Sequence, residues 1–300
     1  MQLETLNECP VCKSSHFKSY LNVVDYTVSK KRFNIQQCKA CDFLFTNPRP
    51  SENEIGYYYQ SQEYISHHDD AKGFMSKVYK TVRDHTIGEK IKMIDRLKPQ
   101  KGDLLDIGCG TGNFVQACKE SGWNITGVEP DQGARQVASD RTRESIFQNI
   151  FEPEIAHQKY DIITMWHVLE HVHLLDETIA WLKAHLKPGG EILIAVPNPE
   201  SHDAKKYGEF WAAYDVPRHL YHFTEKTMKT LMQKHNLKVE AVLPMWFDSF
   251  YVSMLSTKYQ SGATKMIDSM LTGLISNVKG KGNTESSTNT SSLIYLISTK

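Results

Sequence analysis

The sequence lacks a net charge and lacks any long apolar run. Its 300 residues include 35 basic and 35 acidic side chains, so the formal net charge is zero. That balance argues against a protein that binds nucleic acid mainly through charge. No apolar stretch approaches the ~20 residues of a membrane-spanning helix. The first residues lack a basic segment followed by an apolar core, so we expect no secretion signal and a cytoplasmic location.

Cysteine is also scarce, with six residues in the chain, but four of them form a pattern. Cys9 and Cys12, then Cys38 and Cys41, make two C-x-x-C pairs separated by roughly 25 residues. In a reducing compartment this spacing favours a tetrahedral zinc ion over disulfides. A redox-active pair is the alternative. Residues 1–48 are therefore predicted to form a small zinc ribbon.

Three of the 17 glycines alternate with other residues in one run, Asp-Ile-Gly-Cys-Gly-Thr-Gly at residues 106–112. A short apolar strand precedes it and a helix is expected from Asn113. Glycines remove the Cβ atom where a backbone turns sharply against a ligand. A dinucleotide loop would carry a further glycine at Asn113 and would hold a pyrophosphate, for which Asp106 is a poor neighbour. The loop therefore predicts a ligand with a cationic end.

A second acid supports that interpretation. Glu129 closes the next expected strand, about 20 residues further along, where a carboxylate can accept both hydroxyls of a ribose. A cationic amino-acid end joined to a ribose describes S-adenosylmethionine (SAM).

These motifs, Asp106 to Gly112 with Gly127-Val-Glu-Pro, resemble the class I SAM-dependent methyltransferases. The preceding C-x-x-C pairs make the chain similar to bacterial small-molecule methyltransferases, some of which methylate nucleotide-linked sugars at carbon. The resemblance implies an α/β fold: a doubly wound, seven-stranded, Rossmann-like sheet with an antiparallel last strand, plus the ribbon. Strands and helices alternate from Gly102 onward, as such a sheet requires.

The expected domains are the zinc ribbon at 1–48, an aromatic linker and helix at 49–101, and a methyltransferase domain at 102–300 with an insert at about 246–290. Within this plan, the adenine is expected near the turn after the third strand. The predicted cofactor contacts are Asp106, Gly108, Cys109, Gly110, Gly112, Glu129, Asn149, Ile150, Trp166 and His167.

A polar cluster follows the fourth expected strand. If a helix begins near His167, then His167, Glu170 and His171 share one face of it. The run resembles the Glu-x-x-Glu-His motif of ubiquinone-type O-methyltransferases and small-RNA 2′-O-methyltransferases, in which a metal holds the acceptor hydroxyls. Here His167 replaces the first Glu, which favours a softer ion than Mg²⁺. The predicted second divalent-metal site is His167, Glu170, His171 and His222.

The alternative is metal-free, with a histidine as general base, because imidazole suits proton transfer near neutral pH. The catalytic candidates are His171, His219 and His222. Aromatic residues are expected either to cover the acceptor or to pack the core. They are Tyr57, Tyr58, Tyr59, Tyr64, Phe210, Trp211, Tyr214 and Trp246.

The expected function is a SAM-dependent methyltransferase that acts on a small-molecule acceptor at oxygen or carbon. A zinc-ribbon RNA methyltransferase and a SAM-binding protein without catalysis are the alternatives. The sequence leaves open the acceptor, the second metal, and whether the chain is a monomer or a dimer.

Overall fold

The computed structural model describes residues 2–60, 74–246, 248–262, 272 and 289–299. The aromatic residue Tyr64, the polar pair His67 and His68, and most of the predicted insert at about 246–290 lie outside these described residues. None of the described helices is both long enough and apolar enough to cross a membrane.

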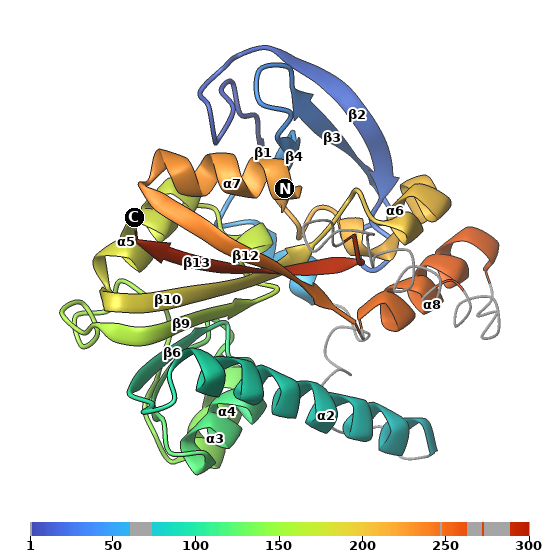
Figure 1. Ribbon diagram of the computed structural model, residues 1–300. Coiled ribbons are helices and arrows are strands. Elements are labelled where there is room, and N and C mark those ends of the chain that lie inside the picture. The colour runs from blue at the N-terminus through green and yellow to red at the C-terminus, as the bar shows by residue number, and fades with distance from the viewer. Residues whose placement is uncertain (1, 61–73, 247, 263–271, 273–288, 300) are drawn as a thin grey trace.

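A seven-stranded sheet forms the centre of the molecule (Figure 1). Its strands are ordered β12-β13-β10-β9-β6-β7-β8. β13 runs antiparallel between β10 and β12, whereas the β6–β9, β6–β7 and β9–β10 pairs are parallel. This arrangement confirms the predicted fold. The strands are β6 (Asp103–Ile107), β7 (Asn124–Val128), β8 (Ile146–Phe147), β9 (Tyr160–Trp166), β10 (Leu186–Pro197), β12 (Leu237–Met245) and β13 (Ser292–Thr299).

Helices cover both faces of this sheet because side chains alternate along each strand. Leu105 and Ile163 pack in the core shared with α5 (Leu175–Ala184) and α7 (Glu225–Lys234). Leu104 and Ile162 pack on the other side with α2 (Phe74–Leu97) and α3 (Asn113–Glu120), and α4 (Gln132–Thr142) packs beside α3. Figure 1 shows these two helical layers above and below the sheet.

The cysteine-bearing N-terminal region forms a second, four-stranded sheet. It contains β2 (Phe17–Val24), β3 (Arg32–Cys38) and β4 (Leu44–Thr46), and its last strand is β11 (Tyr221–His222), which comes from far along the chain. β1 (Leu3–Glu4) pairs separately with β5 (Arg49–Pro50). The small sheet is therefore completed by a strand from the larger part of the chain.

The same region also obtains its apolar core from outside itself. Phe33 and Ile35 pack in one cluster with Trp211 and Tyr214. Trp211 joins η3 (Gly208–Phe210) to η4 (Ala212–Tyr214), which ends at Tyr214, and α6 (His202–Tyr207) precedes them. A unit this small buries little surface alone, so it gains stability by packing on a neighbouring segment. Trp211 and Tyr214 are fully buried here, and they fulfil the core alternative of the prediction.

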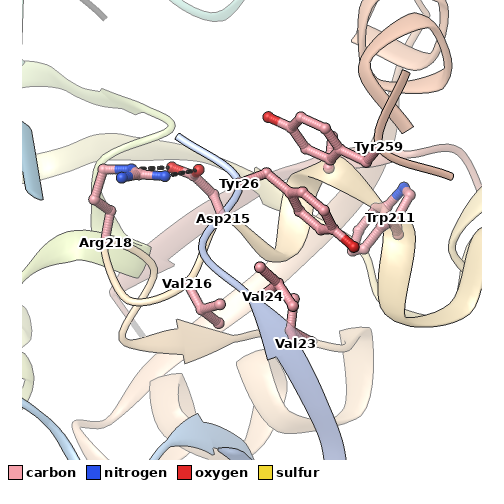
Figure 2. Close-up of a pocket in the computed structure, with 9 residues that line it drawn as sticks. Val23, Val24, Tyr26, Trp211, Asp215, Val216, Arg218 and Tyr259 are labelled. Carbon is pink, nitrogen blue, oxygen red and sulfur yellow. Dashed lines mark hydrogen bonds and ion pairs between the residues drawn. The ribbon is translucent and has the colours of Figure 1, made fainter. Parts of the chain in front are cut away.

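One further helix, α8 (Asp248–Ser261), contacts the tip of the small sheet. The ring of Tyr26 stacks on Tyr259 of α8 with 4.3 Å between ring centroids (Figure 2). The adjoining cavity has a volume of about 10 Å³, enough for a single water molecule. We therefore regard this junction as a packing contact.

Candidate functional site

Four cysteines from two loops gather at one point, as the spacing predicted. Their sulfur atoms all lie within 4.8 Å of one another, with Cys9 Sγ 3.6 Å from Cys41 Sγ and Cys12 Sγ 3.5 Å from Cys38 Sγ. These distances far exceed the ~2.05 Å of a disulfide. They approach the ~3.8 Å edge of a tetrahedron with Zn–S bonds of about 2.3 Å. The donor set therefore fits a tetrahedral metal ion.

The glycine loop (residues 106–112) turns sharply at the carboxyl end of β6. Gly108 has a φ of +72°, and a Cβ there would clash with the Val168 side chain. Its N–H and that of Cys109 both donate to the carbonyl of Val128, at 2.7 and 3.0 Å. Gly110 also has a positive φ, and the space where its Cβ would project is open. The loop thus exposes bare backbone beside the end of the sheet.

Glu129 is fixed by this loop. One carboxylate oxygen accepts the N–H of Gly110 at 2.8 Å and the other accepts the N–H of Asp131 at 2.9 Å. Burial raises the pKa of Glu129, although these two donors counteract the rise. Each oxygen keeps a further lone pair. The carboxylate is therefore held in place and can still accept hydrogen bonds from a ligand.

Asp106 is the buried acid of the site. It is 2% exposed, and one oxygen accepts the hydroxyl of Thr164 at 2.6 Å. Burial raises its pKa to about 7. A cationic ligand group beside Asp106 would stabilise the ionised carboxylate, which burial alone disfavours.

The charge of a lysine that the sequence did not predict acts on Asp106. Lys90 of α2 places Nζ 4.1 Å from the ring centroid of Trp166. Burial lowers its pKa to about 8, while the charges of Asp248 and Asp106 oppose the change. Among the described residues, the indole N–H of Trp166 has no acceptor. Opposite charges and an unsatisfied donor thus surround the ends of β6 and β9.

The remaining predicted cofactor residues flank this area. Gly112 begins α3 in a left-handed conformation against Ala138, and Cys109 is buried. Ile150 is buried in the main core, whereas Asn149 is exposed and accepts the N–H of Phe151. Contact of Asn149 and Ile150 with a ligand stays a prediction.

The expected helix from His167 is wrong. His167 itself has a φ of +58°, and only the single 3₁₀ turn η2 (Leu169–His171) follows. Because the chain turns at this residue, its ring does not share a helical face with His171. Its Nε2 lies 2.6 Å from Asp248 and its Nδ1 lies 3.3 Å from Glu170. Burial would lower the pKa of His167, but these two carboxylates raise it to about 10.

The structure instead gathers Glu170, His171 and His219, whose donor atoms lie within 4.8 Å of one another. We call these three residues the histidine cluster. The two rings meet edge to face with 4.6 Å between centroids. Glu170 is fully buried, and its Oε2 has no partner among the described residues. A buried carboxylate oxygen without a partner is costly, so it points to a missing ligand or ion.

In both imidazoles Nδ1 faces a main-chain carbonyl. His219 Nδ1 lies 2.9 Å from the carbonyl of Ala213, and His171 Nδ1 lies 3.1 Å from the carbonyl of Arg218. A nitrogen facing a carbonyl carries the proton, which leaves a lone pair on each Nε2. Tyr59 Oη also lies 3.0 Å from His171 Nδ1. Burial, aided by the charge of His219, lowers the pKa of His171 to about 4, so this ring is neutral at pH 7.

His222 does not join the predicted metal site. It lies on β11 with Nε2 3.3 Å from Thr46 Oγ1, and its ring packs edge-on against Tyr214. Burial lowers its pKa well below the usual value. The predicted set of His167, Glu170, His171 and His222 is therefore corrected to the histidine cluster. Tyr59, which contacts His171 of this cluster, belongs to the aromatic run seen in the sequence. No sequence signal identified Lys90 or Asp248.

The segment before His219 is anchored by a buried ion pair. Arg218 is 2% exposed and donates from Nε to Asp215 at 2.9 Å (Figure 2). Its Nη1 donates to the carbonyl of Tyr58 at 2.9 Å and lies 3.5 Å from Asp25. Burial would raise the pKa of Asp215, but Arg218 holds it at about 2. Three distant segments thus meet beside the histidine cluster.

Comparison with known proteins gives consistent similarities. Residues 79–242 match a family model described as a methyltransferase domain. The ubiquinone biosynthesis O-methyltransferase of Rickettsia akari (strain Hartford) is 27% identical over 175 residues, which cover 54% of this chain and 69% of that protein. The enzyme of the same name from Saccharophagus degradans is 32% identical over 111 residues, covering 35% of this chain and 47% of that protein. The match thus spans less than half of some curated relatives.

A solved structure shares the fold. It is the magnesium protoporphyrin IX methyltransferase from Synechocystis PCC 6803 with bound SAH, at 12% identity and a TM-score of 0.52. The alignment covers 81% of this chain and 97% of that one.

Proposed function

Because this chain belongs to the methyltransferase-domain family, we propose that it transfers a methyl group from SAM to a small-molecule acceptor. The observation that carries the proposal is the end of the sheet where the glycine loop, Glu129 and the charged pair of Asp106 and Lys90 come together. The proposal includes a cytoplasmic location with reduced thiols.

The charges at this end of the sheet match the parts of SAM. Glu129 would accept the ribose hydroxyls, because its oxygens keep lone pairs after binding Gly110 and Asp131. Asp106 would pair with the ammonium group of the amino-acid end, and Lys90 with its carboxylate. When bound, the cofactor supplies a methyl group activated by the sulfonium.

The histidine cluster would act on the acceptor. The enzyme must remove a proton from a hydroxyl, or from a carbon beside a carbonyl, as the methyl group arrives. His171 is a weak base, because its pKa is lowered to about 4. We therefore assign to Nε2 of His219 the role of accepting the proton that the acceptor loses. Nδ1 of the same ring keeps its own proton, which points to the Ala213 carbonyl. The curated relatives named as O-methyltransferases support oxygen as the acceptor atom, with carbon as the alternative.

A divalent metal in the histidine cluster is the second candidate mechanism. Glu170 Oε2 lacks a partner among the described residues, and the cluster offers two imidazoles and one carboxylate. Such a set suits a transition-metal or zinc ion better than Mg²⁺. When bound, the ion would polarise an acceptor hydroxyl. The four-cysteine cluster would hold a separate, structural Zn²⁺.

Calorimetry with SAM and its product S-adenosylhomocysteine (SAH) tests the proposed function. We expect both to bind the wild-type chain, and Glu129→Ala to weaken binding roughly 30-fold, since it removes charge-assisted hydrogen bonds to the ribose. Glu120→Ala, an exposed acid on α3, is the matched control and should bind normally. Failure of the wild type to bind either ligand would contradict the proposal, as would unchanged affinity in Glu129→Ala.

A further inference from the structure

We propose that the cysteine-bearing sheet positions the histidine cluster, and that Thr46 is the residue through which it does so. The proposal rests on the proposed function in that it takes His219 as the group that acts on the acceptor. It goes further because it gives the N-terminal region a role in the chemistry rather than only in folding.

The connection begins at the cysteines. Cys38 ends β3, and its N–H donates to the carbonyl of Phe43 at 2.9 Å, while the N–H of Asp42 donates back to the Cys38 carbonyl at 3.0 Å. Cys41 lies inside this tight loop, and β4 (Leu44–Thr46) follows directly. A metal held by the cysteines therefore fixes the start of β4.

Thr46, at the end of β4, contacts residues 219–222 through three pairs of atoms. Its N–H donates to the carbonyl of Leu220 at 2.9 Å, and its hydroxyl donates to the carbonyl of His219 at 2.7 Å. The same hydroxyl lies 3.3 Å from His222 Nε2. Thr46 is fully buried, so water does not compete for these bonds. The main chain that directly follows the His219 side chain is thereby held by one residue.

The opposite side of this segment is held by η2. The N–H of Leu220 donates to the carbonyl of Glu170 at 2.8 Å, and His171 Nδ1 faces the carbonyl of Arg218. Residues 218–220 thus lie between β4 and the turn that carries Glu170 and His171. Loss of the β4 contacts removes the hydrogen bonds to the carbonyls of His219 and Leu220 and leaves the ring held through the Ala213 carbonyl. We expect the position of the His219 ring relative to Glu170 and His171 to become less fixed.

Substitution of Thr46 separates this role from simple core filling. Thr46→Val keeps the volume and loses the hydroxyl, whereas Thr46→Ser keeps the hydroxyl and loses a methyl group. Thr142→Val is the matched control, because Thr142 is also buried and donates its hydroxyl to a carbonyl, that of Ala138, at 2.8 Å. Thr142 is the last residue of α4 and belongs neither to the histidine cluster nor to the predicted cofactor contacts.

The experiment uses the full chain as purified, with histidine labelled by ¹⁵N, and records ring nitrogen signals at fixed pH. We expect Thr46→Val to shift or broaden the His219 and His171 signals, and Thr46→Ser and Thr142→Val to leave them unchanged. The affinity for SAH should stay within about twofold in all variants, because distant sites act independently. Unchanged signals in Thr46→Val would overturn the proposal, and so would signals equally altered in Thr46→Ser.

A second measurement covers the case in which Thr46→Val does not fold. Amide hydrogen exchange of the wild-type chain is compared with that of Cys9→Ser/Cys12→Ser, which removes two of the four clustered cysteines and leaves the histidine cluster unaltered. Faster exchange at residues 218–222, with unchanged exchange in the glycine loop, is the expected result. Equal change in both segments, or no change at 218–222, would contradict the positioning role. A wild-type chain that fails to bind SAH would refute the proposed function alone, since neither histidine signals nor exchange depend on the cofactor.

Discussion

The two halves of the candidate site are built in different ways. The cofactor half is local: the glycine loop and Glu129 follow adjacent strands and are joined by the Gly110 hydrogen bond. The histidine half is assembled from distant segments, with Tyr59, His171 and His219 brought together beside the buried Arg218. The first half therefore depends on the parallel sheet and on α2, which carries Lys90, whereas the second half also needs the N-terminal region. Loss of structure in one half should therefore leave the other half intact.

Loss of the cysteine-bound metal should give the largest difference between the halves. Binding of zinc by such sites is worth on the order of 10 kcal/mol of folding free energy. Cys9→Ser/Cys12→Ser removes two of the four thiolate ligands and should therefore lose the ion completely. We expect the histidine half to loosen while SAH still binds. Elemental analysis of protein purified without chelator, together with calorimetry, measures both.

The same analysis distinguishes the two mechanisms. An ion that survives in the double variant would support a metal at the histidine cluster, and one ion lost with none remaining would favour His219 as a base. Loss of SAH affinity together with the metal would show that the halves are not independent.

Substitution of the buried acid should give the next largest effect, confined to the cofactor half. Asp106→Asn should weaken SAH binding about 10- to 30-fold, because the ligand ammonium loses its counter-charge. Methylthioadenosine, which lacks the amino-acid end, should bind both forms equally. Equal losses for the two ligands would contradict the assignment of Asp106 to the ammonium.

The pH dependence follows from the raised pKa of Asp106. The carboxyl must lose its proton to pair with a cation, so SAH affinity of the wild type should fall as pH drops below about 7, and Asp106→Asn should remove this dependence. For the stability of the protein without ligand, the effect of raising the pH is opposite. Because the folded pKa lies above the ordinary 3.8, stability present below that value is lost as pH rises to about 7. Thermal unfolding of both forms across this range measures the difference.

Substitution of Lys90 should give the smallest effect and sharpen the cofactor half further. Lys90→Met should weaken SAM binding about fivefold, since one partly screened ion pair to the carboxylate is lost. Decarboxylated SAM, which lacks that carboxylate, should bind the variant and the wild type equally. Lys92→Met is the control, because Lys92 lies exposed on the same helix and pairs with Glu89. An equal loss for both ligands would rule out a contact between Lys90 and the carboxylate.

Much of the architecture was predictable because its signals are local. Alternation of strands and helices indicated the parallel sheet, and the resemblance carried by the glycine loop correctly implied the antiparallel β13 between β10 and β12. The cysteine spacing predicted a cluster that the structure contains. Within each C-x-x-C pair and within the glycine loop the informative residues lie a few positions apart, so the backbone between them has little freedom.

The histidine half was predicted less well for a physical reason. Helical spacing placed His167 with Glu170 and His171, but a left-handed His167 and a single 3₁₀ turn broke that face. His222 was assigned to the metal site from its position in the chain, yet β11 pairs with β4 and directs its ring to Thr46. Neither strand is long enough, at two and three residues, to be recognised from a periodic pattern.

By itself, the sequence determined the methyltransferase-type sheet, the glycine loop with its acid Glu129, and the grouping of four cysteines, because these depend on short-range backbone geometry. Only the tertiary structure decided which histidines meet, that Lys90 lies over the ring of Trp166, and that Thr46 holds the His219 segment. Those contacts join residues far apart in the chain, and they form because a small sheet without a core of its own must pack on the larger part of the molecule.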